Sequence, residues 1–295
     1  MTEKNMSIVR LEVRANALLG EGPVWDDKLR LLFWLDIKGK RLHSFSPSKN
    51  SSSEVSLPVE TSAIAPRDRG GLVAATRDGF AYLNPKTGNL TMIANIENHL
   101  TNNRFNDGAV DCYGNFIAGS MDEFERDKSG TVYRLNAVGE VMALFGGFVV
   151  CNGPAFSPDG KVLYFSDSVA RQILAFPYEP PDGVLGEPQL FAQVSEEDGY
   201  PDGLTVDENG GVWCAHWDGG HVTRFTPDGR IDRIIQVPVP RVTSCAFGGS
   251  DFQTLFITTA CYGLDSGQLE NFPLSGSLFS AEVGVNGLAL PRFAN

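Results

Sequence analysis

The chain has 295 residues, of which 42% are hydrophobic and 20% are charged, a composition typical of a globular protein and not of a disordered one. Its net charge of -12 argues against nucleic acid and anionic membranes as partners, because both attract basic surfaces. No stretch approaches the ~18 consecutive apolar residues of a membrane span, and the N-terminal sequence MTEKNMSIVR lacks the apolar core of a signal peptide.

The first predicted element is a strand at 8–14, IVRLEVR, in which apolar and polar residues alternate. After it, a small residue that follows a polar one recurs at intervals of 41, 45, 45, 50 and 42 residues: Gly22, Ala63, Gly108, Gly153, Gly203 and Cys245. Each of these begins a unit that consists of a short apolar strand, a turn rich in Gly, Asp or Pro, and a second strand. The second strands are expected at 31–36, 71–76, 115–120, 162–167, 211–216 and 254–259.

A third strand of alternating apolar residues follows in each unit. Six units of about 45 residues, each with three or four short strands, are typical of a β-propeller. We therefore predict an all-β fold, a six-bladed β-propeller with a metal site in its central channel, as a single domain over residues 1–295. The strand at 8–14 would close the last blade and leave no open edge, while 95–103 and 264–273 are expected to be loop or short helical insertions.

The residue before each small residue falls at the start of the first strand of its unit, so the propeller is expected to place all six near one mouth of the channel. They are Glu21, Ser62, Asp107, Asn152, Asp202 and Ser244. Glu21, Asn152 and Asp202 would converge there, and two carboxylates with an amide oxygen suit Ca²⁺, Mg²⁺ or Mn²⁺, while Fe²⁺ or Zn²⁺ could also bind. The alternative is a set of channel-lining polar groups that bind only water and backbone.

Other residues near the same mouth are less specific. His216 could contact a substrate or simply end a strand, and Trp217 could stack on a sugar ring. The five cysteines show no zinc-binding spacing, which predicts buried free thiols in a reducing cytoplasm. The nucleophile motif GxSxG and the zinc motif HExxH are both absent.

Several segments together resemble the SMP-30/gluconolactonase/LRE family of sugar lactonases. They are GEGPVW, RFNDGAVD, NGPAFSPDGKVLYFSDS, YPDGLTVDENGGVW and VTSCAFGGSDFQTLFITTA, and the resemblance runs from about residue 18 to residue 280. It implies a six-bladed propeller with one catalytic divalent cation in its channel. The metal-binding Glu, Asn and Asp of the family match Glu21, Asn152 and Asp202.

The resemblance also implies a substrate pocket. Its Arg and Asn match Arg104 and Asn106 in RFND, and a pocket role falls on Glu123 after GSM. The implied reaction is the hydrolysis of a pentono- or hexono-1,4- or 1,5-lactone to the aldonic acid, in non-phosphorylative sugar oxidation. Asp202 would act as ligand and as general base. The sugar lactone would be the partner, with no nucleic acid, membrane or obligate protein partner, and the location would be cytoplasmic.

Two other classes of function stay open from the sequence. One is a metal-dependent hydrolase of organophosphates or aryl esters on the same kind of propeller. The other is a non-catalytic, metal-binding propeller, for example a Ca²⁺ binder; WD or GH dipeptides in every blade would favour a protein-interaction propeller, and they do not recur in this way.

Overall fold

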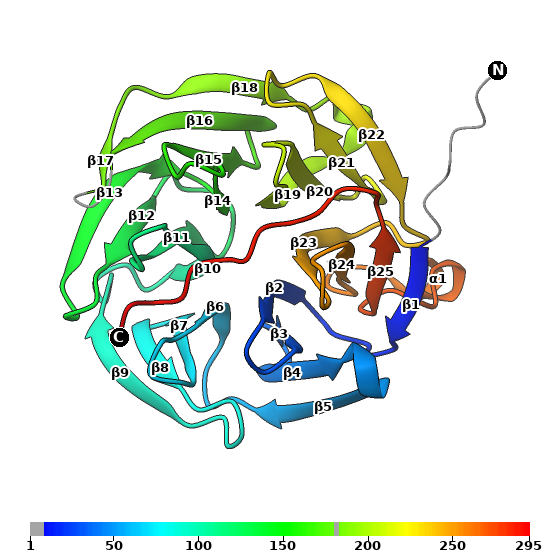
Figure 1. Cartoon of the computed structure of the whole chain (residues 1–295), viewed down its shortest axis with the longest axis horizontal. Coiled ribbons are helices and arrows are strands. Elements are labelled where there is room, and N and C mark those ends of the chain that lie inside the picture. Colours follow the sequence, from blue (N-terminus) through cyan, green and yellow to red (C-terminus); the bar gives the residue numbers. More distant parts are fainter. Residues whose placement is uncertain (1–8, 180–182) are drawn as a thin grey trace.

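Each sequence unit forms its own antiparallel sheet, and within the described part of the chain six sheets surround a central axis as the blades of a propeller (Figure 1). The structure, a computed structural model, describes residues 9–179 and 183–295. The predicted all-β, six-bladed fold is therefore confirmed.

The position of each strand in its blade follows from its composition. All six residues of β6 (Thr61–Pro66) are buried, because an inner strand has a neighbouring blade or the axis on each side, and small or apolar side chains suit that place. The outer strand β5 (Ser51–Ser56) reads SSSEVS and is almost entirely exposed. The inner strand is thus buried and the outer strand is exposed.

In each blade the inner, second and third strands follow one another along the chain. The inner strands are β2 (Gly20–Asp26), β6, β10 (Asn103–Val110), β14 (Cys151–Phe156), β19 (Tyr200–Val206) and β23 (Val242–Gly248). The second strands are β3 (Leu31–Asp36), β7 (Leu72–Thr76), β11 (Phe116–Asp122), β15 (Val162–Asp167), β20 (Val212–Trp217) and β24 (Thr254–Thr259). The third strands are β4 (Arg41–Ser46), β8 (Gly79–Leu83), β12 (Gly130–Leu135), β16 (Gln172–Glu179), β21 (His221–Phe225) and β25 (Leu278–Glu282).

The outer strands complete the blades. They are β5, β9 (Leu90–Asn95), β13 (Val141–Phe148), β18 (Gln189–Gln193), β22 (Ile231–Gln236) and, in the sixth blade, β1 (Val9–Val13). The remaining elements are β17 (Val184–Leu185), which pairs with β16, and the short helices η1 (Pro47–Lys49), η2 (Glu196–Asp198) and α1 (Ser266–Asn271). α1 lies in the predicted insertion 264–273, whereas 96–102 forms turns without a helix.

The sixth blade combines the two ends of the propeller. β1 pairs antiparallel with β25, with Val9 opposite Ala281 and Leu11 opposite Phe279, so the third strand of this blade presents no free edge. Residue 8, which the sequence analysis included in this strand, lies outside the described residues.

An irregularity recurs at the same point of every blade. The pairing of each inner strand with its second strand shifts register near its start, at Glu21/Val24, Thr61/Ala63, Phe105/Asp107, Asn152/Ala155, Pro201/Leu204 and Val242/Ser244. Such bulges redirect side chains and are common beside active sites. The fold therefore offers six equivalent places at which a polar side chain can leave the sheet pattern.

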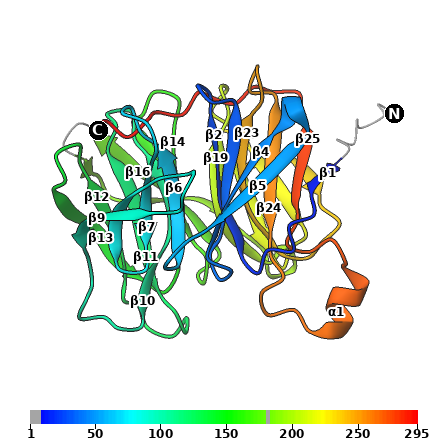
Figure 2. The same cartoon turned by 90° about the horizontal axis from the view of Figure 1, so that it is seen from below.

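The segment 286–295 runs across the centre of the ring (red in Figure 1) and lies at the opposite end of the ring from α1 (Figure 2). Gly287 forms a bridge with Asp207, and Phe293 forms a parallel bridge with Arg67. The segment thereby contacts several blades, an arrangement that the sequence pattern did not indicate.

Phe293 anchors this segment. Its side chain is fully buried in an apolar cluster that includes Phe80 and Phe105. Replacing Phe293 with Leu should lower the free energy of unfolding by about 1 kcal/mol, because the smaller side chain leaves part of the buried site unfilled. Urea denaturation measures the change. The same substitution at the exposed Phe272 should change it by less than about 0.5 kcal/mol, and equal effects at both positions would contradict a packing role for the segment.

The cysteines and the helices bear on two further expectations. All five cysteines are unpaired, as predicted, but only Cys151, Cys214 and Cys245 are buried; Cys112 is exposed, which corrects the expectation of buried thiols throughout. None of the helices in the described residues has the length and apolar character needed to cross a bilayer.

Candidate active site

A cavity of about 420 Å³ opens at the end of the ring opposite the segment 286–295, among the starts of the inner strands. Five of the predicted site residues line it: Glu21 of β2, Arg104 and Asn106 of β10, Asn152 of β14 and Asp202 of β19. These side chains come from four different blades. The fold thus brings together residues that are up to 181 positions apart in the sequence (202 − 21).

A chain of hydrogen bonds fixes the orientation of Asn152. Nδ2 of Asn106 donates to Oδ1 of Asn152 (2.7 Å), and Nδ2 of Asn152 donates to Oγ of Ser168 (2.9 Å). Because the Ser168 hydroxyl donates onward to the carbonyl oxygen of Pro201 (2.7 Å), Ser168 must accept from Asn152. The Asn152 oxygen is thereby identified, and it keeps a second lone pair for another donor or a cation.

The local backbone conformation explains why two of the repeat positions are glycine. Gly22 and Gly153 follow Glu21 and Asn152 with φ angles of 54° and 48°, a left-handed conformation that favours glycine. A Cβ atom on Gly153 would also lie 2.7 Å from the backbone nitrogen of Leu204 on the neighbouring inner strand. At these two positions glycine therefore permits the bulge that presents Glu21 and Asn152, and at Gly153 it also permits the close approach of adjacent blades.

The acidic groups at the centre of the ring affect one another. Burial raises the pKa of Glu21 well above its usual range, and the charge of Asp107 adds to this effect. Burial also raises the pKa of Asp202, with further contributions from Glu21 and Asp107. A bound cation stabilises the ionised forms of such closely placed carboxylates.

The donor set fits a hard divalent cation. Among the described residues, no three or more His, Cys, Asp or Glu side chains form a group that could hold a metal ion. A cation at Glu21 and Asp202 would therefore take its third protein ligand from the amide oxygen of Asn152. Two carboxylate oxygens and an amide oxygen, with water in the remaining positions, are the ligands that Ca²⁺, Mg²⁺ and Mn²⁺ prefer.

Arg104 is held firmly in the cavity wall. Its Nη1 donates to Oδ1 of Asn106 (2.8 Å) and to the carbonyl oxygen of Phe105 (3.0 Å), and its Nε lies 3.2 Å from Oε2 of Glu123. Glu123 does not line the cavity. Its carboxylate also pairs with Lys38 and Arg77, so Glu123 lies behind Arg104, and its role in the substrate pocket stays a prediction.

Six polar residues were predicted to lie at one mouth of the channel, and three of them, Glu21, Asn152 and Asp202, line the cavity. Ser62 does not line the cavity, and its Oγ donates to the carbonyl oxygen of Ala75 (3.3 Å). Asp107 and Ser244 line a second cavity of about 210 Å³, beneath the segment 286–295.

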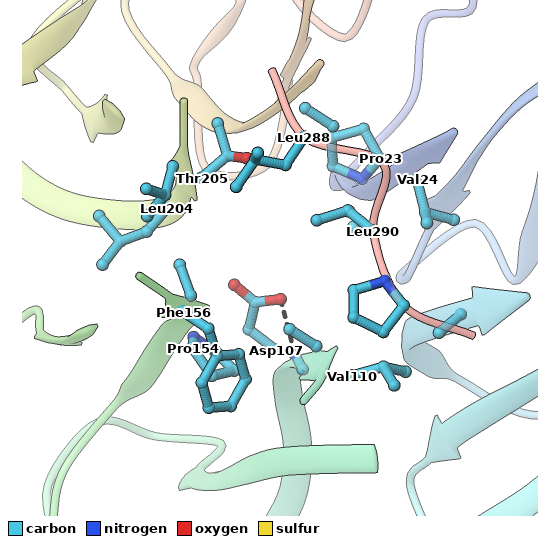
Figure 3. Close-up of a pocket in the computed structure, with 18 of the residues that line it drawn as sticks. Pro23, Val24, Asp107, Val110, Pro154, Phe156, Leu204, Thr205, Leu288 and Leu290 are labelled. Atoms are coloured by element: carbon cyan, nitrogen blue, oxygen red, sulfur yellow. Dashed lines mark hydrogen bonds between the residues drawn. The ribbon is translucent and has the colours of Figure 1, made fainter. Parts of the chain in front are cut away.

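Figure 3 shows the Asp107 carboxylate in this second cavity, where it lies among apolar residues of the inner strands and of the C-terminal segment. Asp107 accepts hydrogen bonds from the backbone nitrogens of Gly108 (2.7 Å) and Gly153 (2.8 Å). Burial nevertheless raises its pKa to about 6. Because the bond from Gly153 joins β10 to β14, it gives Asp107 a structural role in the described contacts.

Sequence reasoning missed several cavity residues. Tyr200, Tyr262 and Glu125 line the cavity, as does Trp217, which the sequence had singled out. His216 does not line it. Its ring is buried, its Nδ1 donates to the carbonyl oxygen of Asp198 (3.0 Å), and burial lowers its pKa to about 4. The structure thus supports the strand-end interpretation of His216.

Comparisons with known proteins agree with this geometry. The chain is 37% identical to a 6-deoxy-6-sulfogluconolactonase of Pseudomonas putida over 96% of its length and 97% of that relative. It is 32% identical to a regucalcin of Xenopus laevis over 98% of its length and 100% of that relative. A solved calcium-binding regucalcin of Agrobacterium tumefaciens superposes with a TM-score of 0.94 at 29% identity, over 98% of each chain. Because the family profile of the SMP-30/gluconolactonase/LRE-like region matches residues 19–261, the chain belongs to that family.

Proposed function

We propose that this protein is a metal-dependent lactonase that hydrolyses a pentono- or hexonolactone to the aldonic acid. The observation that carries the proposal is the shared cavity, in which Glu21, Asn152 and Asp202 meet Arg104 and Asn106. The relationship to a sulfogluconolactonase at 37% identity supports the reaction class. The ring size and the sugar would be set by the rest of the cavity wall.

Glu21, Asn152 and Asp202 would hold one divalent cation through oxygen atoms. The regucalcin described as calcium-binding supports a cation of this class, and Mg²⁺, Mn²⁺, Fe²⁺ and Zn²⁺ are the other candidates. When bound, such a cation supplies a Lewis acid for the lactone carbonyl and for the negative charge that develops on its oxygen.

The side chains of the protein would perform the remaining steps. The Asp202 carboxylate would accept a proton from the attacking water. Arg104 would donate to the oxygens of the lactone, and Oδ1 of Asn106, which accepts from Arg104 (2.8 Å), would accept a hydrogen bond from a hydroxyl group of the sugar through its second lone pair. Together they would fix the orientation of the substrate. The aromatic side chains of Trp217, Tyr200 and Tyr262 would provide flat surfaces for the sugar ring and exclude water from one side of it.

Metal removal tests the proposal. Protein treated with a chelator should lose lactone hydrolysis, and reloading with single divalent metals should restore it. The assay follows acid release at a weakly buffered pH over a panel of pentono- and hexonolactones, with an aryl ester and a phosphotriester included. Full activity in protein shown by elemental analysis to be metal-free would contradict the mechanism, and turnover of the ester or phosphotriester alone would contradict the substrate class.

A further inference from the structure

One acidic side chain of the active-site cavity has no partner. Glu125 lines the cavity, and no described residue forms a hydrogen bond or an ion pair with its carboxylate. Its charge acts on Asp202, which has the same sign. By contrast, Asp218 in the cavity wall accepts a hydrogen bond from Nε of Arg241 (2.9 Å). Glu125 is therefore a free acceptor and an uncompensated negative charge.

The backbone holds Glu125 in a defined place. Its φ angle of 55° is left-handed, which is costly for a residue with a side chain. A tight turn maintains it: the nitrogen of Glu125 donates to the carbonyl oxygen of Asp122 (3.0 Å), and the buried Asp122 carboxylate accepts from the nitrogens of Arg126 (2.7 Å) and Asp127 (3.2 Å). The turn therefore holds Glu125 at the cavity although the Glu125 side chain itself makes no hydrogen bond.

Apart from Arg104, the described residues of the cavity lining include no cation that could balance a second negative charge on a substrate. The Arg104 guanidinium contacts Glu123 and Asn106, and the proposed function assigns its remaining donors to the oxygens of the lactone. Three other cations lie against aromatic residues of the lining without lining it themselves: Arg241 at 4.7 Å from Trp217, Arg171 at 4.2 Å from Tyr200 and Lys38 at 5.8 Å from Tyr262.

We propose that Glu125 is a specificity-determining residue that makes this protein select neutral sugar lactones over lactones with a second anionic group, such as a sulfonate or a phosphate. This inference rests on the proposed lactonase function. Glu125 accepts a hydrogen bond from a hydroxyl group of a neutral sugar, and it repels an anionic substituent at the same place. The protein would then differ in substrate from its sulfogluconolactonase relative, despite their 37% identity.

The test compares kcat/KM for D-glucono-1,5-lactone and for its 6-phosphate, with metal-loaded protein. The wild type should prefer the neutral lactone. Glu125→Gln keeps the size of the side chain and removes its charge. The ratio of kcat/KM for the neutral lactone to kcat/KM for the phosphate should therefore fall by about tenfold, the effect expected for one like-charge pair near the surface. Added salt should narrow the preference of the wild type and leave that of the variant nearly unchanged.

Asp127→Asn is the matched control, because it removes the same charge from the same turn at an exposed residue that does not line the cavity. It should keep the wild-type preference. Equal turnover of both lactones by the wild type, or equal effects of the two substitutions, would overturn the inference about Glu125 but not the proposed lactonase function. A metal-loaded wild type that hydrolyses neither lactone, nor any other of the panel, would overturn the proposed function and this inference with it.

Discussion

Asp202→Asn should lower kcat for lactone hydrolysis by about 10²-fold or more, the scale of losing a general base. Asparagine keeps the size of the side chain and one oxygen, but it removes the negative charge and the group that accepts the proton. Asp202 is buried beside Glu21, so the substitution also removes one of two carboxylates from the proposed cation site. Cation affinity should therefore fall together with kcat.

Elemental analysis separates the two effects. The variant is assayed at cation concentrations that restore full occupancy, and any remaining loss of kcat then belongs to proton transfer. Because replacing one of several repelling buried carboxylates relieves that repulsion, the metal-free variant should melt at the same temperature as the metal-free wild type or higher. A variant that keeps both its metal and its rate would show that Asp202 is neither ligand nor base.

Arg104→Ala should lower kcat/KM by about 10²-fold, equivalent to about 2–4 kcal/mol for a charge-assisted hydrogen bond lost from a buried site. The metal content should not change, because a guanidinium does not bind a cation. Nη1 of Arg104 contacts Asn106, but Asn106 also donates to the carbonyl oxygen of Cys151, and Asn152 donates to Ser168. Because these bonds remain without the arginine, its removal should disturb the substrate wall while the ligand oxygen of Asn152 stays in place.

Arg104→Lys tests whether a positive charge alone is sufficient at this position. Lysine keeps the charge but not the planar fork that can donate to Asn106 and to a substrate together, so it should recover only a small part of the loss. Both substitutions change the surroundings of Glu123, which keeps Lys38 and Arg77 as partners. Melting temperatures of the variants show whether this change destabilises the protein. Loss of the metal in Arg104→Ala would contradict the separation of substrate wall and cation site.

The fold was predictable because its signals are local and repeated. A small residue after a polar one, followed by an apolar strand, a turn and a second strand, recurs in every blade, and in each blade the register shift lies at or beside this residue. The path of the segment 286–295 was not predictable. Its contacts with Arg67 and Asp207 depend on the shape of the finished ring, which no local pattern encodes.

The site was predictable at the inner strands and less so at the loops. Ser62, Asp107 and Ser244 share a repeat position with the proposed ligands but do not line the cavity, so the repeat alone does not select the site. Glu21, Asn152 and Asp202, which line it, occupy repeat positions. Glu123 and Glu125 do not: they are two residues apart, and one lies behind Arg104 while the other lines the cavity. The turn that separates them depends on the left-handed conformation of a glutamate, which residue type alone does not reveal.

The segment 286–295 also bears on how a substrate would reach the active site. Because it lies across the far end of the ring and lines the second cavity, we expect a substrate to enter the active-site cavity, and a product to leave it, at the end where the inner strands begin. Opening a lactone converts an uncharged molecule into an anion. If the protein hydrolyses a lactone as proposed, the newly formed carboxylate would be repelled by the unpaired Glu125 in the cavity wall, whereas the incoming lactone would not be. This repulsion would favour release of the product.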